Sequence, residues 1–179
     1  MLTEDNSDAI LVIKHGALGD IIQGLDAFAS LRRGNPKSHI SILTTPAFAP
    51  IFVQMPWFDE VIVDHRASVL NIPQALRIRA VLRRPWRCVL DLQCSRRTAW
   101  YHMFYSCLQT RWIGTAKNCS DPLPNFIGVN NRDRMLFAAK WAGGRDSVAN
   151  LDWLLPPADQ SKGNKTETPP EKFVVFVVG

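Results

Sequence analysis

The segment IKHGALGD, close to the N-terminus, places three side chains that can carry a proton around two glycines. Asp20 or His15 could take a proton from a hydroxyl group as a general base, and Lys14 could bind an anion. Gly16 and Gly19 would let a ligand approach the backbone closely. The glycine spacing lacks the full G-x-G-x-x-G of dinucleotide sites and the G-K-[ST] of nucleoside triphosphate sites. The segment therefore predicts a ligand loop with a base, and gives little support to NAD or NTP binding.

Each of these residues also has a structural interpretation. Asp20 stands where the first helix is expected to open, and aspartate is a favoured helix cap that complements the helix dipole. His15 could be a loop side chain hydrogen-bonded to the backbone. Lys14 could be a solvated residue at the end of a strand. A helix cap can also act as a base, so the residue types alone leave these alternatives open.

A second group of charged residues lies between Arg77 and Arg97, where seven arginines accompany one acid, Asp91. Arginine binds phosphate and carboxylate groups through paired hydrogen bonds, so this segment could contact an anionic substrate or an anionic membrane surface. At 100° per residue, these arginines form no single stripe on a helix, because Arg77 and Arg84 fall on one side and Arg79 and Arg83 on the other. The alternative is a solvated helix edge. Arg97 is the favoured ligand because it follows the end of an expected strand.

The elements that would position these residues alternate between strand and helix patterns. Apolar runs predict strands at Ala9–Ile13, His39–Thr45, Glu60–Asp64, Arg87–Gln93, Arg111–Thr115 and Phe173–Val178. Helical spacing of apolar residues predicts helices over Ile21–Arg32, Ile72–Ala80 and Trp100–Leu108. This alternation indicates an α/β fold with a Rossmann-like, doubly wound parallel sheet. In such a sheet, IKHGALGD lies at the carboxyl end of a strand, where ligands bind.

The composition changes near the C-terminus. Residues 1–155 are expected to form one Rossmann-like domain, and the polar, proline-rich residues 156–171 a linker. Residues 172–179, KFVVFVVG, read as one buried strand that reaches a glycine. One strand cannot build a domain, so we expect it to open a second, truncated domain. The alternative is that it closes the sheet of the first domain.

The overall composition limits the classes of protein that the chain could form. Its 179 residues are 46% apolar and carry a net charge of +5, which is typical of a globular protein with an anionic partner. The longest apolar run, FVVFVV, is too short to span a bilayer, and the acidic N-terminus does not resemble a signal peptide. We therefore expect a cytoplasmic protein. The four widely spaced cysteines predict reduced thiols and no metal site.

Several stretches resemble one family in order along nearly the whole chain. ILVIKHGALGDIIQGLDAFASLRRG and the residues up to VIVD resemble the start of the lipopolysaccharide heptosyltransferases, glycosyltransferase family 9. VLDLQCSRRTAW is similar to the family's D-L-Q-x-x-x-R-[ST] stretch, and RWIG to a strand that ends in Ile-Gly. The D-L-Q-x-x-x-R-[ST] residues are Asp91, Leu92, Gln93, Arg97 and Thr98. Two positions depart from the pattern: Asp26 replaces a usual proline, and Cys94 a common glycine.

The resemblance implies the N-terminal, acceptor-binding half of a GT-B glycosyltransferase. Such an enzyme would transfer heptose from ADP-heptose, with inversion, to a lipopolysaccharide inner-core precursor, with Asp20 as general base. The matching substrate-binding residues would be Gly16, Gly19, Gln93, Arg97 and Thr98. The resemblance also implies no cofactor and no metal, a peripheral position at the inner membrane, and no obligate protein partner. This chain would lack the donor half.

Two other functions remain open on the sequence. The chain could be a module that binds an anionic glycolipid without turning it over. The basic charge also permits a nucleic-acid-binding α/β domain. Such a domain would need exposed aromatic residues among the basic ones or a known motif, and we find no such motif, so we expect no nucleic acid partner.

Overall fold

The computed structural model describes residues 8–66, 71–107 and 109–154. Within them, six parallel strands form one sheet in the order β3-β2-β1-β4-β5-β6. The strands are β1 Ala9–Ile13, β2 Ile40–Thr44, β3 Glu60–Val63, β4 Trp86–Asp91, β5 Arg111–Gly114 and β6 Asp121–Pro122. The expected α/β class and parallel sheet are confirmed. The expected strand at Phe173–Val178 and the linker at 156–171 lie outside the described residues.

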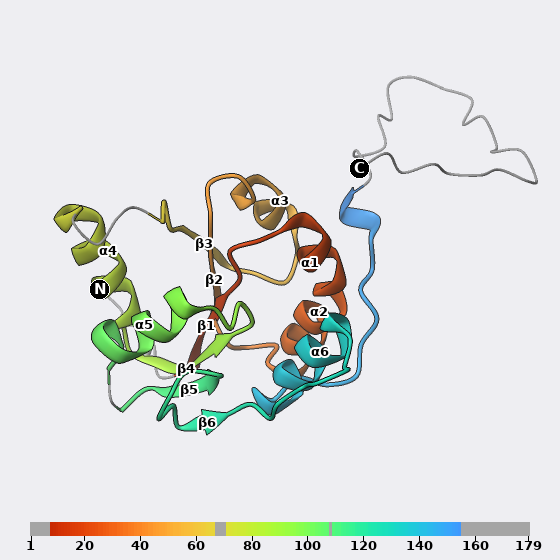
Figure 1. The fold of residues 1–179 in the computed structure, drawn as a ribbon. Helices are drawn as coiled ribbons and strands as arrows, with labels where there is room; N and C mark the ends of the chain where they lie inside the picture. The colour runs from red at the N-terminus through yellow and green to blue at the C-terminus, as the bar shows by residue number, and fades with distance from the viewer. Residues whose placement is uncertain (1–7, 67–70, 108, 155–179) are drawn as a thin grey trace, which may run out of the picture.

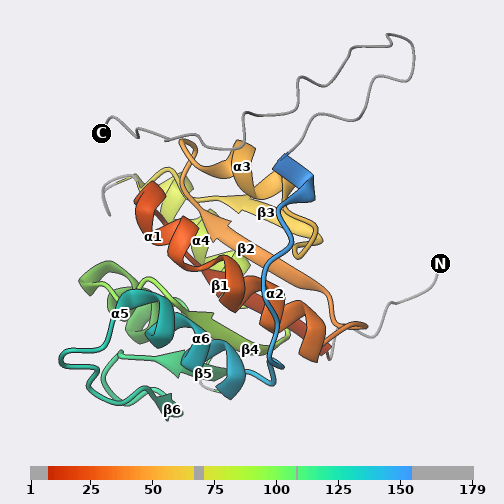
Figure 2. The same ribbon diagram turned by 90° about the vertical axis from the view of Figure 1, so that its right-hand side faces the viewer.

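The sheet is covered by helices on both faces (Figures 1 and 2). The helices are α1 Leu18–Gln23, α2 Leu25–Gly34, α3 Ala49–Gln54, α4 Ile72–Leu82, α5 Arg96–Tyr105 and α6 Asn131–Trp141, and a short 3₁₀ helix spans Asp152–Leu154. Helices α1, α2, α3 and α6 pack on one face, whereas α4 and α5 pack on the other. The central strands are buried on both faces, which explains why they read as continuous apolar runs.

Strand β1 shows how the layers form. Along β1, Ile10 and Val12 contact the core under α1 and α2, whereas Leu11 and Ile13 contact the core under α4 and α5. Successive strand side chains point to opposite faces, so one apolar run serves both cores. No helix among the described residues is long and apolar enough to cross a membrane.

Some elements differ from the expectation. The helix expected over Ile21–Arg32 is two helices that meet at Gly24, whose N–H donates to the carbonyls of Asp20 and Ile21. Helix α5 ends at Tyr105, earlier than the expected Leu108. Helices α3 and α6 and the two-residue strand β6 were not predicted. Helix α6 begins with four polar or charged residues and buries only Met135, Ala138 and Ala139, so its apolar spacing is weak.

The strand order places β1 and the point where the chain reverses direction across the sheet at the centre of the sheet. Strand β1 pairs with β2 on one side and with β4 on the other, and the chain crosses between the two halves of the sheet after β3. The loops after β1 and β4 therefore meet at the switch point of the sheet. Open α/β sheets bind ligands in the crevice at such a point.

Candidate active site

The loop after β1 brings Gly16 against α3. Gly16 has a φ of 126°, and an added Cβ would lie 2.1 Å from the ring of Phe48. A glycine is therefore required there by the backbone and by close packing. Gly19 differs, because a Cβ at this position would meet nothing within 4 Å. Of the two glycines expected to contact substrate, Gly19 is the one that borders open space.

Asp20 lies in the first turn of α1 and does not cap it. The N-cap is Ala17, and no side chain caps this helix. The carboxylate instead spans two contacts: Lys14 Nζ lies 3.3 Å from Oδ2, and Asn131 Nδ2 donates to Oδ1 at 3.0 Å. The interpretation of Asp20 as a helix cap is therefore wrong, and its side chain is 43% exposed at the end of the central strand.

Lys14 is buried, with a side chain only 1% exposed. It is neither the solvated strand end nor the exposed anion ligand that the sequence allowed. Burial lowers the pKa of Lys14, and the Asp20 carboxylate offsets part of that effect. A buried ammonium group requires a partner, and Asp20 supplies it. Asp20 is thus both the candidate base and the counter-ion of Lys14.

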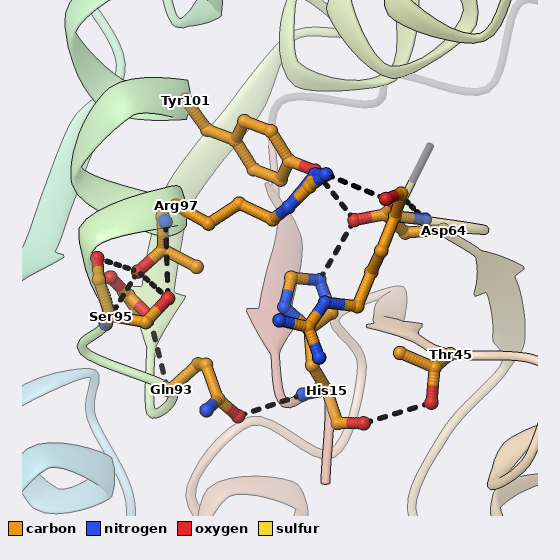
Figure 3. Close-up of polar contacts among 10 residues, drawn as sticks. His15, Thr45, Asp64, Gln93, Ser95, Arg97 and Tyr101 are labelled. Atoms are coloured by element: carbon orange, nitrogen blue, oxygen red, sulfur yellow. Dashed lines mark hydrogen bonds and ion pairs between the residues drawn. The ribbon is translucent and has the colours of Figure 1, made fainter. Parts of the chain in front are cut away.

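The His15 side chain points toward Asp64 and Tyr101, which form a second polar cluster (Figure 3). Its Nε2 lies 3.1 Å from Asp64 Oδ2, which also accepts a hydrogen bond of 2.7 Å from the Tyr101 hydroxyl. Burial would raise the pKa of Asp64, but hydrogen bonds from His15, Tyr101 and the Arg66 N–H lower it to about 2. His15 and Asp64 are almost fully buried, so His15 has little access to a substrate hydroxyl.

Gln93 joins the two central loops. Its Oε1 accepts a hydrogen bond of 3.0 Å from the His15 N–H, across the gap between the ends of β1 and β4. The loop of Gln93 is shaped by the buried Asp91, whose Oδ1 accepts from the N–H groups of Gln93 and Cys94 at 3.0 and 2.8 Å. Burial raises the pKa of Asp91, although those N–H groups partly oppose it. Gln93 therefore positions the loop that leads to Asp20.

Cys94, at the position where the family commonly has glycine, has a φ of 47°. This left-handed conformation suits glycine best, which explains the family preference. Burial and the nearby Asp91 raise the pKa of the Cys94 thiol to about 11. The thiol is therefore protonated at neutral pH and is a poor nucleophile.

Thr98 and Arg97 lie in the first turn of α5. The Thr98 hydroxyl and Ser95 form a reciprocal cap, in which Ser95 Oγ accepts from the Thr98 N–H and Thr98 Oγ1 accepts from the Ser95 N–H. Thr98 is fully buried, so it has no surface for the direct substrate contact that was expected. Arg97 is half-buried: it donates to the Arg66 carbonyl at 2.8 Å and lies over the Tyr101 ring.

Asp26, which departs from the family pattern, connects three parts of the chain. It accepts hydrogen bonds from Arg132 of α6 and, at 2.9 Å, from the N–H of Ala149. These contacts hold α2 against α6 and against the segment that follows it. The substitution of the family's usual proline therefore has a structural role away from Asp20.

A hollow of about 690 Å³ opens beside Asp20. Cys94, Thr115 and Leu123 line it from the loops after β4, β5 and β6, and Asn131 and Arg134 line it from α6. Asn131 also donates to Asp20, and its own Oδ1 accepts from Arg134 at 2.6 Å. The hollow therefore offers amide, guanidinium and apolar surfaces one hydrogen bond away from the carboxylate.

Neither Asn131 nor Arg134 was identified from the sequence. No sequence motif marks them, and they are 111 and 114 residues from Asp20. Lys14, Asp64 and Tyr101 were likewise not assigned these roles. Among the described residues, no group of three or more His, Cys, Asp and Glu side chains is placed to hold a metal ion.

Comparisons with known proteins agree on the fold. The search found no protein-family model that matches the chain. Solved structures that resemble it include E. coli heptosyltransferase WaaC with ADP, with a TM-score of 0.61, 16% identity and coverage of 81% of this chain. A glycosyltransferase of family 9 from Veillonella parvula aligns with a TM-score of 0.65 and 19% identity over 79% of this chain. The resemblance predicted from the sequence is thus confirmed for the fold, which is that of GT-B type glycosyltransferases.

The chain is shorter than these relatives. It spans 51% of the WaaC chain and 43% of the Veillonella chain. A Haemophilus influenzae protein provisionally named a glycosyltransferase is 37% identical over 61 residues, which are 34% of this chain and 18% of that protein. The chain therefore has the fold of about half of a glycosyltransferase of this kind.

Proposed function

We propose that this chain is the acceptor-binding half of a family 9 glycosyltransferase. The whole enzyme would transfer heptose from ADP-heptose, with inversion, to a lipopolysaccharide inner-core acceptor, without a metal or cofactor. One observation carries the proposal: the Asp20 carboxylate is half-exposed at the switch point of the sheet, one hydrogen bond from the hollow. The likeness to heptosyltransferase structures supports the choice of donor and acceptor.

In this proposal Asp20 takes the proton of the acceptor hydroxyl as that oxygen attacks the anomeric carbon. The attack comes from the face opposite the departing ADP, which inverts the configuration. Lys14 and Asn131 hold the two carboxylate oxygens, so the base is fixed in position before the acceptor binds. Gly19 leaves open space beside the base, and Arg97, in the first turn of α5, is the candidate contact for an acceptor phosphate or carboxylate.

The other predicted ligands act indirectly. Gln93 holds the loop of His15, and Gly16 allows that loop to pass Phe48. Thr98 fixes the start of α5 and thereby the position of Arg97. These three residues position the site.

The test is turnover by a two-domain enzyme that carries this chain. Asp20→Asn keeps the size of the side chain and removes the base, so turnover should fall by about 10²–10⁴ while acceptor affinity is retained. Asp26→Asn is the matched control, because it also weakens a carboxylate contact to α6 but lies away from the proposed chemistry. Unchanged turnover of Asp20→Asn per folded molecule would refute the role of Asp20.

A non-catalytic acceptor-binding module is the second candidate, because the hollow and the half-exposed carboxylate beside it could bind an acceptor without turning it over. Calorimetric titration with ADP-heptose separates the two functions. We expect no measurable donor affinity for the 179-residue chain and clear affinity when a donor half follows it. Tight donor binding by the chain alone would place the nucleotide at the HGALGD loop and would contradict the assignment of Asp20 as base.

A further inference from the structure

The charged residues are distributed unevenly along the chain. Residues 65–120 contain ten Lys and Arg and a single acid, Asp91, which is buried, although the whole chain has a net charge of only +5. The basic charge is therefore concentrated in the part of the chain that contains α4 and α5. Neither of these helices contains an Asp or a Glu.

Several of these arginines are used within the fold. Arg84 pairs with Glu60 at 2.9 Å, and Arg87 pairs with Asp8 at 3.1 Å. Arg79, Arg83 and Arg96 are different, because they are exposed and their side chains have no hydrogen-bond or ion-pair partner among residues 8–66, 71–107 and 109–154. They remain available for an external anion.

The free arginines lie on the same side as exposed apolar side chains. One side of α4, continued to its C-cap residue Arg83, carries Ile72, Leu76, Arg79 and Arg83 within about 60° of one another at 100° per residue. Ile78, Val81 and Leu82 occupy the opposite side, which is buried against the sheet. The expectation that Arg79 and Arg83 lie apart from Arg77 and Arg84 fits this arrangement, since Arg84 turns toward Glu60.

Helix α5 continues the same surface. Arg96 and Met103 are two turns apart on its exposed side, and Thr98 and Tyr101 are on the buried side. The two helices cover the same face of the sheet (Figure 1). We call this surface the α4–α5 outer face, made of Ile72, Leu76, Arg79, Arg83, Arg96 and Met103. Its apolar members are 66%, 56% and 63% exposed.

We propose that the α4–α5 outer face binds the surface of a membrane that contains anionic phospholipids. Interfacial helices combine arginines, which attract acidic head groups, with apolar side chains that enter the head-group layer. A symmetric contact with a second copy would place the free arginines close together, which like charges oppose. Helix α5 also carries the exposed Phe104 against Trp100, on which a single-stranded nucleic acid could stack, so nucleic acid is an outcome that the test must separate from membrane binding.

Membrane binding by the α4–α5 outer face would bring the candidate active site close to the membrane. This inference rests on the proposed function. Helix α5 begins directly after the loop of Gln93, so the face extends to the edge of the sheet that carries Asp20. A chain bound through α4 and α5 would hold that edge near the head groups. An acceptor anchored in the same membrane by its lipid would then reach the hollow without leaving the bilayer.

The test is flotation of the purified 179-residue chain with vesicles of phosphatidylethanolamine and about one-third phosphatidylglycerol, compared with pure phosphatidylcholine. We expect preferential binding to the anionic vesicles. Arg79→Gln/Arg83→Gln should weaken that binding about 25-fold, since each charge near the surface contributes about fivefold. The matched control Lys37→Gln/Arg145→Gln removes the same charge from exposed positions on other elements and should change binding by less than about threefold.

A second variant tests the apolar part. Leu76→Gln/Met103→Gln keeps all charges, changes only exposed side chains to another good helix former, and should weaken vesicle binding while leaving the melting temperature nearly unchanged. Equal effects of the arginine pair and its control, or no binding to either vesicle, would overturn the proposal. Preferential binding to a single-stranded oligonucleotide over the anionic vesicles would also overturn it. None of these readouts involves glycosyl transfer, so failure here leaves the proposed enzyme function intact.

Discussion

The pairing of Lys14 with Asp20 predicts that removal of the carboxylate destabilises the fold. The Lys14 side chain is 1% exposed, and Asp20 is the only charged group whose ion pair with it is seen among the described residues. In Asp20→Ala the buried ammonium loses this partner. A fully buried pair broken in this way costs about 3–5 kcal/mol. Because Asp20 is half-exposed, we expect about 2 kcal/mol, the range for a hydrogen bond to a charged group.

The loss should depend on pH in a defined direction. Burial already lowers the pKa of Lys14 in the folded state, and loss of Asp20 removes the opposing effect. The unfolded variant therefore binds more protons than the folded one at neutral and mildly alkaline pH, so its stability rises with pH. The difference between wild type and Asp20→Ala should shrink as the pH approaches the ordinary lysine value of 10.5.

The assay is urea unfolding followed by circular dichroism, in a double-mutant cycle. Lys14→Met keeps most of the apolar stem, and Lys14→Met/Asp20→Ala removes both charges. The double variant should be more stable than Asp20→Ala and within about 1 kcal/mol of the wild type, because no buried charge is left without a partner. If Asp20→Ala matches the wild type, or if Lys14→Met gives no rescue, the described ion pair does not stabilise the fold. Any loss of turnover in Asp20→Asn could then not be attributed to a loss of stability.

Two further predictions concern stability. Tyr101→Phe removes a hydrogen bond to Asp64 and should raise the pKa of Asp64 from about 2 toward its ordinary value of 3.8. A carboxyl group whose pKa is lowered by folding stabilises the fold at pH values above its unfolded-state pKa, and this stabilisation is lost as the pH falls. Acid unfolding of Tyr101→Phe should therefore begin at a higher pH than that of the wild type. An unchanged acid transition would contradict the prediction. Gly34→Ala should lower the free energy of unfolding by about 1–3 kcal/mol, because the new Cβ would lie 1.9 Å from the Gly143 carbonyl oxygen. Gly19→Ala, which meets nothing within 4 Å, is the control in thermal melts, and equal melting of the two variants would contradict the described contact.

The sequence predicted the central elements well because both faces of the sheet are covered. Strands β1 and β2 are buried throughout, and β4 is buried at every residue except Arg87, so their apolar residues stand out in the sequence. Helix α6 was missed because its residues Asn131 to Arg134 are polar and its buried side is narrow. Gly24 interrupts the first helix at a position where the apolar spacing continues without a break.

The sequence predicted the site residues only where they are close together in the sequence. Gly16 lies in the loop after β1, and Gly19 and Asp20 lie in the first turn of α1, so all three are close together in the sequence and follow a strand that the sequence predicts. Lys14 was misjudged because a lysine is seldom buried, and no pattern in the sequence announces its pairing with Asp20. Thr98 matched a family motif, but a motif cannot distinguish a hydroxyl that caps a helix from one that contacts a substrate. Asn131 and Arg134 reach the site only through the packing of α6.

The distance in sequence between Asp20 and Asn131 has a consequence for the order of folding. Strand β1 and helix α1 leave the ribosome first, whereas Asn131 follows 111 residues later. During synthesis, the carboxylate and the buried lysine must therefore exist for some time without α6 to close the site beside them. Contacts of such separation form late, because the intervening chain has to be ordered first. The nascent chain can thus acquire its sheet well before it acquires a finished binding surface, and variants that slow the docking of α6 would delay maturation without altering the final structure.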